Sequence, residues 1–132
     1  MKASSWGLIA QEGKYLFIER SGKTSRSGQW CPPGGGRKPD ESQEDACVRE
    51  VKEEVGLDVV VTLLLRKDEG FYYYLCEPVG AQQVITLKLN ECSSYQWVDP
   101  DELLALGEIM ELKRMIRVFS DLGYTIVVPD LQ

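Results

Sequence analysis

Short apolar runs separated by polar turns recur along most of the chain, and this pattern predicts β-strands. Two such runs, Ser5 to Ala10 and Tyr15 to Arg20, flank the segment Gln11-Glu12-Gly13-Lys14, which predicts a β-hairpin. Residues 21–29 are rich in Gly, Ser and Thr and are expected to form a loop. Further strands are expected over residues 57–65, 71–76, 84–89 and 95–98, with a last short strand over residues 125–128.

The prolines and glycines of residues 30–36 (WCPPGGG) disfavour regular structure. After this segment, apolar residues recur at the spacing of an α-helix. Asp40 or Ser42 is the expected N-cap of the helix, and Gly56 stands where a C-terminal cap belongs. Four apolar residues share one side of a 3.6-residue wheel and are expected to face the core: Cys47, Val48, Val51 and Val55.

The C-terminal part of the chain predicts two more helical segments. Asp99 and Pro100 form a typical helix start, and apolar residues recur at helical spacing between Glu108 and Leu122. Strands mixed with helices predict a mixed α/β fold in which helices cover a sheet. At 132 residues, with no linker or internal repeat, the chain is expected to form one domain over residues 1–132.

Composition narrows the classes of function. The chain has no histidine, which excludes His-based triads and His metal ligands. A formal charge of -6 argues against a protein that binds duplex nucleic acid. No apolar run approaches the ~18 residues that span a membrane, and no signal-peptide pattern follows Met1. The four cysteines form no C-x-x-C pair, so we expect reduced, packed thiols in a cytoplasmic protein.

Three glutamates form the most informative cluster. Glu50, Glu53 and Glu54 lie at positions i, i+3 and i+4, so they share one strip of the expected helix. The strip occupies the last turn, where the helix dipole disfavours acidic side chains. A solvated acidic face is one interpretation. A site for a hard divalent cation is the other, because Mg²⁺ prefers oxygen ligands together with substrate phosphates.

Two neighbouring features bear on this choice. The backbone of residues 34–36, which has no side chains, can approach a metal or phosphate closely, although a Pro-Gly turn explains these glycines equally well. Basic residues, but no acidic ones, occur between Arg20 and Lys38. This stretch is either a solvated basic loop or a surface for a polyphosphate that a metal bridges to the acidic helix.

The stretch from Gly35 to Leu57 resembles the Nudix box, G-x5-E-x7-R-E-U-x-E-E-x-G-U, in which U is an aliphatic residue. Every specified position is met, with Glu41 as the isolated acid and residues 49–57 (REVKEEVGL) as the second half. The run from Trp30 to Gly35 is similar to the family's W-x-x-P-G-G segment, although a doubled proline departs from it. The resemblance implies an α/β/α sandwich with a mixed central sheet. It also implies hydrolysis of a nucleoside diphosphate linked to another moiety.

The resemblance assigns the metal site and its support to particular residues. Arg49 would orient a glutamate within the box, while Glu41 and Gly35 would support the site. The implied cofactor is Mg²⁺, for which Mn²⁺ is a possible substitute. The implied metal ligands are Glu50, Glu53, Glu54 and the carbonyl of Gly34.

A catalytic base is expected from the box or from a later loop. Some family members take a further ligand or base from a loop that precedes a strand containing tryptophan. Glu91, six residues ahead of Trp97, matches that position, and an exposed loop acid is the alternative. Since the chain has no histidine, Glu53 or Glu91 is the expected base. The implied catalytic set is Glu53, Glu54, Arg49 and Glu91.

The substrate is expected to be a small nucleotide or polyphosphate. Arg20, Arg26 or Arg37 would hold its distal phosphates. A tyrosine in the region of Tyr73 resembles a feature of members that cleave dinucleoside polyphosphates, where it would stack on a base, and sheet packing is the alternative. The best match is therefore a dinucleoside polyphosphate or a similar polyphosphorylated compound.

Two alternatives stay open for the function. One is a nucleoside triphosphate pyrophosphatase of house-cleaning type, and the other is a sensor that binds nucleotides without cleaving them. Neither duplex nucleic acid nor a membrane is an expected partner. The sequence is compatible with a monomer or a homodimer.

Overall fold

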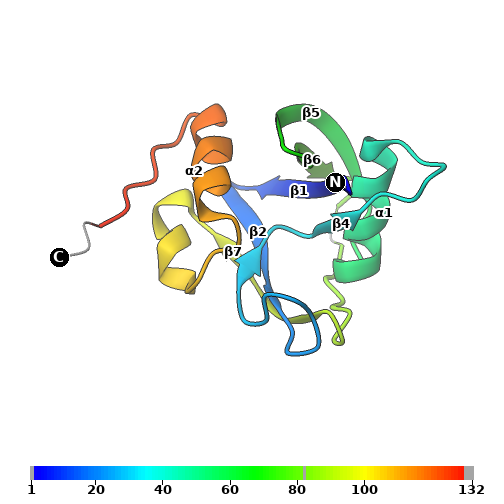
Figure 1. The fold of residues 1–132 in the computed structure, drawn as a ribbon, viewed down its shortest axis with the longest axis horizontal. Coiled ribbons are helices and arrows are strands. Elements are labelled where there is room, and N and C mark those ends of the chain that lie inside the picture. Colours follow the sequence, from blue (N-terminus) through cyan, green and yellow to red (C-terminus); the bar gives the residue numbers. More distant parts are fainter. Residues whose placement is uncertain (1, 82, 130–132) are drawn as a thin grey trace.

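The computed structural model describes residues 2–81 and 83–129. Figure 1 shows the strands between two helices, α1 on one side and α2 on the other. The mixed α/β fold, with helices covering a sheet, is thus confirmed. The elements in chain order are β1 (Ser4–Gln11), β2 (Lys14–Arg20), β3 (Trp30–Cys31), β4 (Gly34–Gly36), α1 (Gln43–Val55), β5 (Val59–Asp68), β6 (Phe71–Pro78), β7 (Cys92–Val98), the 3₁₀ helix η1 (Pro100–Leu106) and α2 (Leu112–Asp121).

The sheet combines parallel and antiparallel pairs. The expected hairpin is confirmed, since β1 and β2 pair antiparallel with Ala10 opposite Tyr15. β1 also pairs in parallel with β6, where Trp6 lies opposite Tyr73, and β6 pairs antiparallel with β5. β4 joins β1 and β7 joins β2, both antiparallel. The strand order β3-β2-β1-β6-β5 leaves β5 at one end of the sheet.

The helix that carries the acidic strip begins and ends as the sequence predicts. Ser42 is the N-cap, and its hydroxyl accepts a hydrogen bond from the backbone N–H of Asp45 at 3.0 Å. At the other end, Gly56 adopts a left-handed conformation with φ 77°, which favours glycine. The expected apolar side packs into the core: Cys47, Val51 and Val55 are fully buried, and Val48 is partly buried.

The strand expected over residues 84–89 does not form, and this segment has no regular structure. Its backbone instead caps the C-terminal end of α1. The N–H of Thr86 donates to the carbonyl of Val55, and the N–H of Lys88 donates to the carbonyl of Glu54, both at 2.9 Å. The last carbonyls of a helix have no partner within the helix, so this segment satisfies them. The segment therefore bonds to the end of a helix and does not join the sheet.

The C-terminal helices form with shifted bounds. η1 begins at the expected start, but α2 begins at Leu112 and not at Glu108. Ile109 forms a bridge to the backbone of β3, and Glu111 has φ 56°, so the preceding residues cannot continue the helix. The short strand expected over residues 125–128 is also wrong, since these residues have no regular structure.

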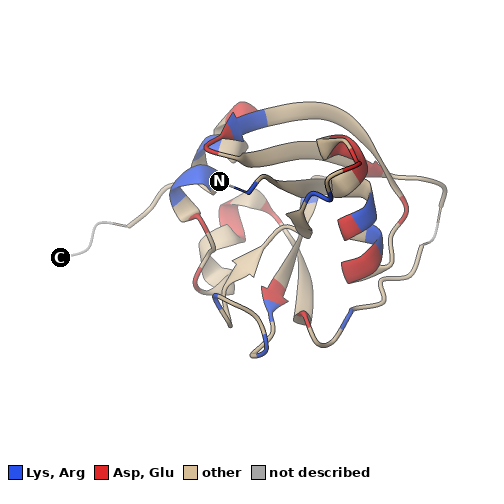
Figure 2. Cartoon of the chain, turned by 45° about the vertical axis from the view of Figure 1, so that its right-hand side comes forward, with Lys and Arg blue, Asp and Glu red and all other residues tan. Residues whose placement is uncertain are grey.

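The remaining expectations concern cysteines, charge and membranes. All four cysteines are buried and form no disulfide, as expected from their spacing. Figure 2 shows acidic and basic residues interspersed along the ribbon of α1. Within the described ranges, no helix has the length and apolar character needed to cross a membrane.

Candidate active site

A cavity of about 330 Å³ lies where β4 meets α1. A larger cavity of about 620 Å³ lies between β7 and residues 78–81 and 83–85, and none of the described residues in its wall is acidic or basic. The smaller cavity contains three carboxylates and one guanidinium, so it is the one suited to a charged ligand. Its wall consists of Ser4, Trp6, Arg20, Thr24, Gly34, Gly35, Gly36, Glu50, Glu54 and Glu91.

Glu54 is the buried carboxylate of this cavity, with 6% of its surface exposed. Its Oε1 accepts a hydrogen bond from the backbone N–H of Gly34 at 2.8 Å. Burial is the main cause that raises the pKa of Glu54 to about 8, and the charges of Glu50 and Glu91 act in the same direction. The Gly34 N–H and Arg20 oppose this shift in pKa. A bound cation would stabilise the ionised form of such a carboxylate.

Glu50 lies one helical turn earlier, and its carboxylate rests against Gly35. A Cβ on Gly35 would lie 2.7 Å from the carboxyl carbon of Glu50. A Cβ on Gly34 would instead lie 2.2 Å from the backbone carbonyl oxygen of Ser5. Gly34 therefore allows β4 to approach β1, whereas Gly35 leaves room for the Glu50 carboxylate. Burial raises the pKa of Glu50 too, although the neighbouring Arg49 opposes this.

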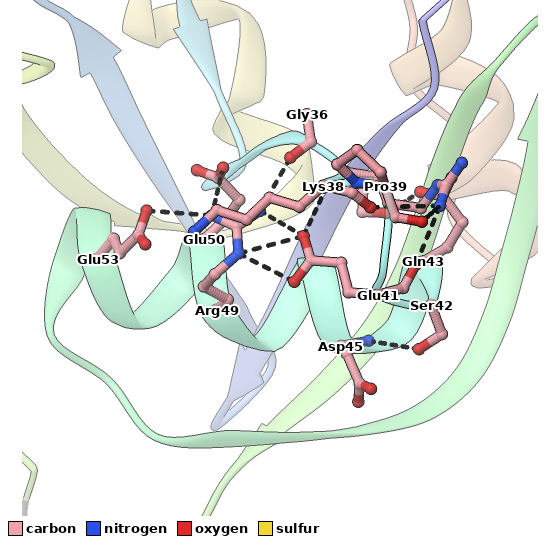
Figure 3. A network of polar contacts seen from close by, with 12 residues as sticks. Gly36, Lys38, Pro39, Glu41, Ser42, Gln43, Asp45, Arg49, Glu50 and Glu53 are labelled. Carbon is pink, nitrogen blue, oxygen red and sulfur yellow. Dashed lines mark hydrogen bonds and ion pairs between the residues drawn. The ribbon is translucent and has the colours of Figure 1, made fainter.

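Arg49 connects the carboxylates along α1, as Figure 3 shows. Its guanidinium donates to Glu41 Oε1 at 2.6 Å, to Glu50 Oε1 at 2.9 Å and to Glu53 Oε2 at 3.2 Å. It also donates to the carbonyl of Gly36 at 2.9 Å. The planar fork of arginine suits several simultaneous acceptors. Arg49 thus holds Glu50 in place, whereas Glu53 lies outside the cavity wall with 42% of its side chain exposed.

Glu41 completes this network from the segment ahead of α1. Its Oε1 also accepts a hydrogen bond from the backbone N–H of Lys38 at 2.8 Å. The hydrogen bonds from Arg49 and then from Lys38 lower the pKa of Glu41 to about 2. Glu41 is therefore ionised at neutral pH and supports Arg49 without lining the cavity.

Glu91 reaches the cavity from the turn before β7. Its backbone carbonyl accepts a hydrogen bond from the N–H of Ser21 at 2.9 Å, which joins this turn to the loop after β2. Its carboxylate lies 3.5 Å from the ammonium group of Lys88. The structure therefore brings Glu91 together with Glu50 and Glu54, although 37 residues separate Glu54 from Glu91 in the sequence.

The three arginines expected to hold phosphates have different positions. Arg20 lines the cavity. Arg26 forms an ion pair with Glu111, just ahead of α2. Arg37 donates to backbone carbonyls of its own loop, including that of Glu41 at 3.1 Å. The structure thus brings Arg20 to the carboxylates and does not bring Arg26 or Arg37 there.

The stacking role expected of Tyr73 is wrong in this structure. Tyr73 is 1% exposed, and its ring stacks on that of Phe71 with centroids 6.3 Å apart. Burial raises the pKa of its hydroxyl group. Tyr73 belongs to the hydrophobic core, and Phe71 packs against that core. Sheet packing, the alternative interpretation, accounts for this residue.

The sequence pattern did not reveal three residues of the cavity wall: Ser4, Trp6 and Thr24. The indole Nε1 of Trp6 donates to the hydroxyl of Ser4 at 2.9 Å, and its ring lies against Gly34. The pairing of β1 with β4, in which Ser4 lies opposite Gly36, brings both residues to the cavity. The sequence pattern of a strand shows which side chains share a face, but it does not show which other strand will pair with it.

The donor set of the cavity fits a hard divalent cation. Its wall offers carboxylate oxygens from Glu50, Glu54 and Glu91 but no thiol or imidazole. No three acidic or thiol side chains in residues 2–81 and 83–129 converge into a ready-made metal centre. Mg²⁺ is usually held by one or two carboxylates, with water and substrate phosphates completing its shell. Glu50 and Glu54 line the cavity, whereas Glu53, the third expected ligand, lies outside its wall.

Known sequences resemble this chain over most of its length. The sequence model of the NUDIX domain matches residues 1–119. The chain is 32% identical over 101 residues to the CTP pyrophosphohydrolase of Escherichia coli K12, covering 74% of this chain and 75% of that protein. It is 30% identical over 129 residues to the nucleoside triphosphatase NudI of Escherichia coli O1:K1 / APEC, covering 84% of this chain and 91% of that protein.

Solved structures share the fold. A MutT protein from Methanosarcina mazei Go1 superposes with a TM-score of 0.73 at 25% identity, covering 92% of this chain and 93% of that one. A NUDIX hydrolase from Nitrosomonas europaea superposes with a TM-score of 0.75 at 22% identity, covering 92% of this chain and 88% of that one. The expected α/β/α sandwich is confirmed by these likenesses.

Proposed function

The chain belongs to the NUDIX hydrolase family, whose members act on phosphoanhydride bonds, and we propose that it is a divalent-metal-dependent pyrophosphohydrolase of nucleoside triphosphates. The observation that carries this proposal is the cavity that Glu50, Glu54, Glu91 and Arg20 line together. The relatives named for CTP and for nucleoside triphosphates support the substrate class. The products would be a nucleoside monophosphate and pyrophosphate.

Glu50 and Glu54 would hold Mg²⁺, or Mn²⁺ in its place, with the carbonyl of Gly34 as a further ligand. When bound, the cation polarises the phosphate and offsets its negative charge. Arg49 supports this arrangement by holding Glu50 with a hydrogen bond of 2.9 Å. Gly35 supports it by leaving the space that the Glu50 carboxylate occupies.

The remaining steps belong to other side chains of the cavity. Arg20 would donate hydrogen bonds to the distal phosphates of the substrate. Glu91 would accept a proton from the attacking water, because it lines the cavity. Glu53, the other candidate base, accepts a hydrogen bond from Arg49 outside the cavity wall. Glu91 is therefore the better-placed base.

A dinucleoside polyphosphate is a weaker candidate substrate. That expectation depended on a tyrosine that could stack on a base, and Tyr73 is 1% exposed. Tyr74, the next residue, is 3% exposed and its hydroxyl donates to Glu44 at 3.3 Å. The burial of both residues removes the support that the tyrosines gave to this substrate.

The test is hydrolysis of a nucleotide panel with Mg²⁺, with the products identified by chromatography. We expect nucleoside monophosphate and pyrophosphate from triphosphates with the wild type, and loss of turnover by orders of magnitude in Glu54→Gln. Asp45→Asn is the matched control, since Asp45 is an exposed acid on the same helix and lies outside the cavity wall. Cleavage of dinucleoside polyphosphates alone, release of orthophosphate, or binding without turnover would contradict the proposal.

A further inference from the structure

The turn that carries Glu91 is attached to two other parts of the fold. The N–H of Lys88 donates to the carbonyl of Glu54 at 2.9 Å, which ties the start of the turn to α1. The N–H of Glu91 then donates back to the carbonyl of Lys88, also at 2.9 Å. The second attachment is to the loop after β2, and Ser21 makes it. Figure 1 shows this loop beside the segment that precedes β7.

Ser21 is buried, with 5% of its surface exposed, whereas residues 22–29 of the same loop are exposed or partly exposed. Its hydroxyl donates to the backbone carbonyl of Asn90 at 2.7 Å, and its backbone N–H donates to the carbonyl of Glu91 at 2.9 Å. The hydroxyl oxygen also accepts a hydrogen bond from the N–H of Lys23 at 3.3 Å. The buried hydroxyl thus both donates and accepts, which offsets the cost of removing it from water.

Ser21 also lies next to the cavity residues of its own loop. The ladder between β2 and β7 ends with Arg20 opposite Cys92, so Ser21 is the first residue beyond it. The carbonyl of Ser21 accepts hydrogen bonds from the N–H of Thr24 at 3.2 Å and from its hydroxyl at 2.9 Å. Arg20, Thr24 and Glu91 all line the carboxylate cavity. Ser21 therefore connects three residues of the cavity wall from a position behind that wall.

The two hydrogen bonds from Ser21 to the turn depend on different atoms. Any residue except proline at this position would supply the N–H that bonds to Glu91. The bond to Asn90 requires the hydroxyl, and alanine would remove it. A turn held by one hydrogen bond can rotate about that bond, whereas two bonds to consecutive carbonyls fix its orientation. The hydroxyl of Ser21 therefore determines how the turn presents the side chain of Glu91.

From these contacts we propose that Ser21 is a positioning residue for hydrolysis, and that its buried hydroxyl fixes the turn of Glu91 relative to Arg20. This inference rests on the proposed function, in which Glu91 accepts a proton from the attacking water. A misplacement of about 1 Å can lower the rate of an enzyme about 100-fold. The loss of one hydrogen bond has a far smaller effect on the stability of the fold. Catalysis should therefore depend on this hydroxyl more strongly than folding does.

Steady-state kinetics of Ser21→Ala on a nucleoside triphosphate test this role. We expect kcat to fall about 10- to 100-fold. KM should change little, because the guanidinium of Arg20 keeps its own hydrogen bond to the carbonyl of Ser25 at 2.8 Å. Ser93→Ala is the matched control, since Ser93 is an exposed serine of β7 whose hydroxyl donates to Glu19 Oε1 at 3.0 Å, outside the cavity wall. The control should keep the wild-type kcat, and both variants should keep the wild-type circular dichroism spectrum.

A double-mutant cycle separates positioning from a general loosening of the fold. In a Glu91→Gln background the carboxylate that Ser21 positions is already absent, so adding Ser21→Ala should change kcat by no more than about twofold. Equal fold-losses in both backgrounds, a wild-type kcat in Ser21→Ala or in Glu91→Gln, or an unfolded Ser21→Ala would overturn the role of Ser21 while leaving wild-type hydrolysis intact. A wild type that releases no pyrophosphate from triphosphates would instead overturn the proposed function, and the role of Ser21 with it.

Discussion

Alanine at Gly34 should mainly lower the stability of the fold, whereas alanine at Gly35 should mainly lower the rate of hydrolysis. At Gly34, a Cβ would lie 2.2 Å from the carbonyl oxygen of Ser5 and 2.7 Å from the Cα of Trp6. Both atoms belong to the backbone of β1, so β4 must move away from its partner strand. Overpacking of this kind costs about 1–3 kcal/mol. Since about 1 kcal/mol moves Tm by about 3–5 °C at this size, we expect Gly34→Ala to lose up to about 10–15 °C.

At Gly35, the new Cβ would meet a side chain and not the backbone. The atoms within reach are those of the Glu50 carboxylate, at 2.7 to 2.9 Å, and this group can rotate away. We therefore expect the Tm of Gly35→Ala to stay within a few degrees of the wild type. Its kcat/KM should fall about 10- to 100-fold, the usual effect of disturbing the groups that position a metal ligand. Gly36→Ala is the control, since its Cβ would meet nothing closer than Lys2 Cε at 3.6 Å.

Thermal unfolding followed by circular dichroism and kcat/KM on a nucleoside triphosphate measure these effects. Gly35→Ala with wild-type kcat/KM would show that the position of the Glu50 carboxylate is not needed for hydrolysis. Gly34→Ala with wild-type Tm would show that the close approach of β4 to β1 is not rigid. Either result would refute the separate roles assigned to the two glycines.

Three further changes have defined outcomes. Arg49→Lys should lower kcat/KM at least about tenfold at nearly constant Tm, because the ammonium group of lysine lacks the planar fork with which Arg49 binds several acceptors at once. Wild-type kinetics in this variant would contradict the prediction. The pKa of Glu41 is lowered from 4.5 to about 2, so its ionised form stabilises the fold above pH 4.5 and this contribution is lost as the pH falls toward 2. Glu41→Gln should therefore be less stable than the wild type at pH 7, with a difference that shrinks on acidification in denaturant titrations; a constant difference would refute the assignment. Gln83→Ala should lower the free energy of unfolding in urea by about 1 kcal/mol, because the Gln83 amide exchanges hydrogen bonds of 2.7 and 2.8 Å with the backbone of Asp58; an unchanged midpoint would contradict it.

The part of the fold that local sequence determines was predictable. The cap at Ser42, the left-handed glycine at Gly56 and the apolar side of α1 are all local properties of one segment, and the structure confirms them. The hairpin of β1 and β2 is local in the same sense, because its two strands are joined by a short turn. Local signals of this kind depend on backbone conformation and side-chain period, which a sequence displays directly.

The features that depend on distant contacts were not predictable. The pattern of residues 84–89 predicts a strand, but the N–H groups of Thr86 and Lys88 donate to the last carbonyls of α1. Arg26 stands in a basic stretch, but it pairs with Glu111, which is 85 residues away. Tyr73 was a candidate for stacking on a base, but its ring is buried against Phe71. A single sequence indicates a strand or a charged side chain, but it does not show which distant residue will contact it.

The most direct test of metal binding at Glu50 and Glu54 is titration of the folded protein with Mn²⁺, followed by electron paramagnetic resonance. The wild type should bind Mn²⁺ and release it on addition of Mg²⁺. Glu54→Gln should bind at least about tenfold more weakly while keeping its circular dichroism spectrum, because an amide oxygen can still accept the Gly34 N–H. Equal Mn²⁺ affinities in the wild type and Glu54→Gln would contradict a cation site at this carboxylate.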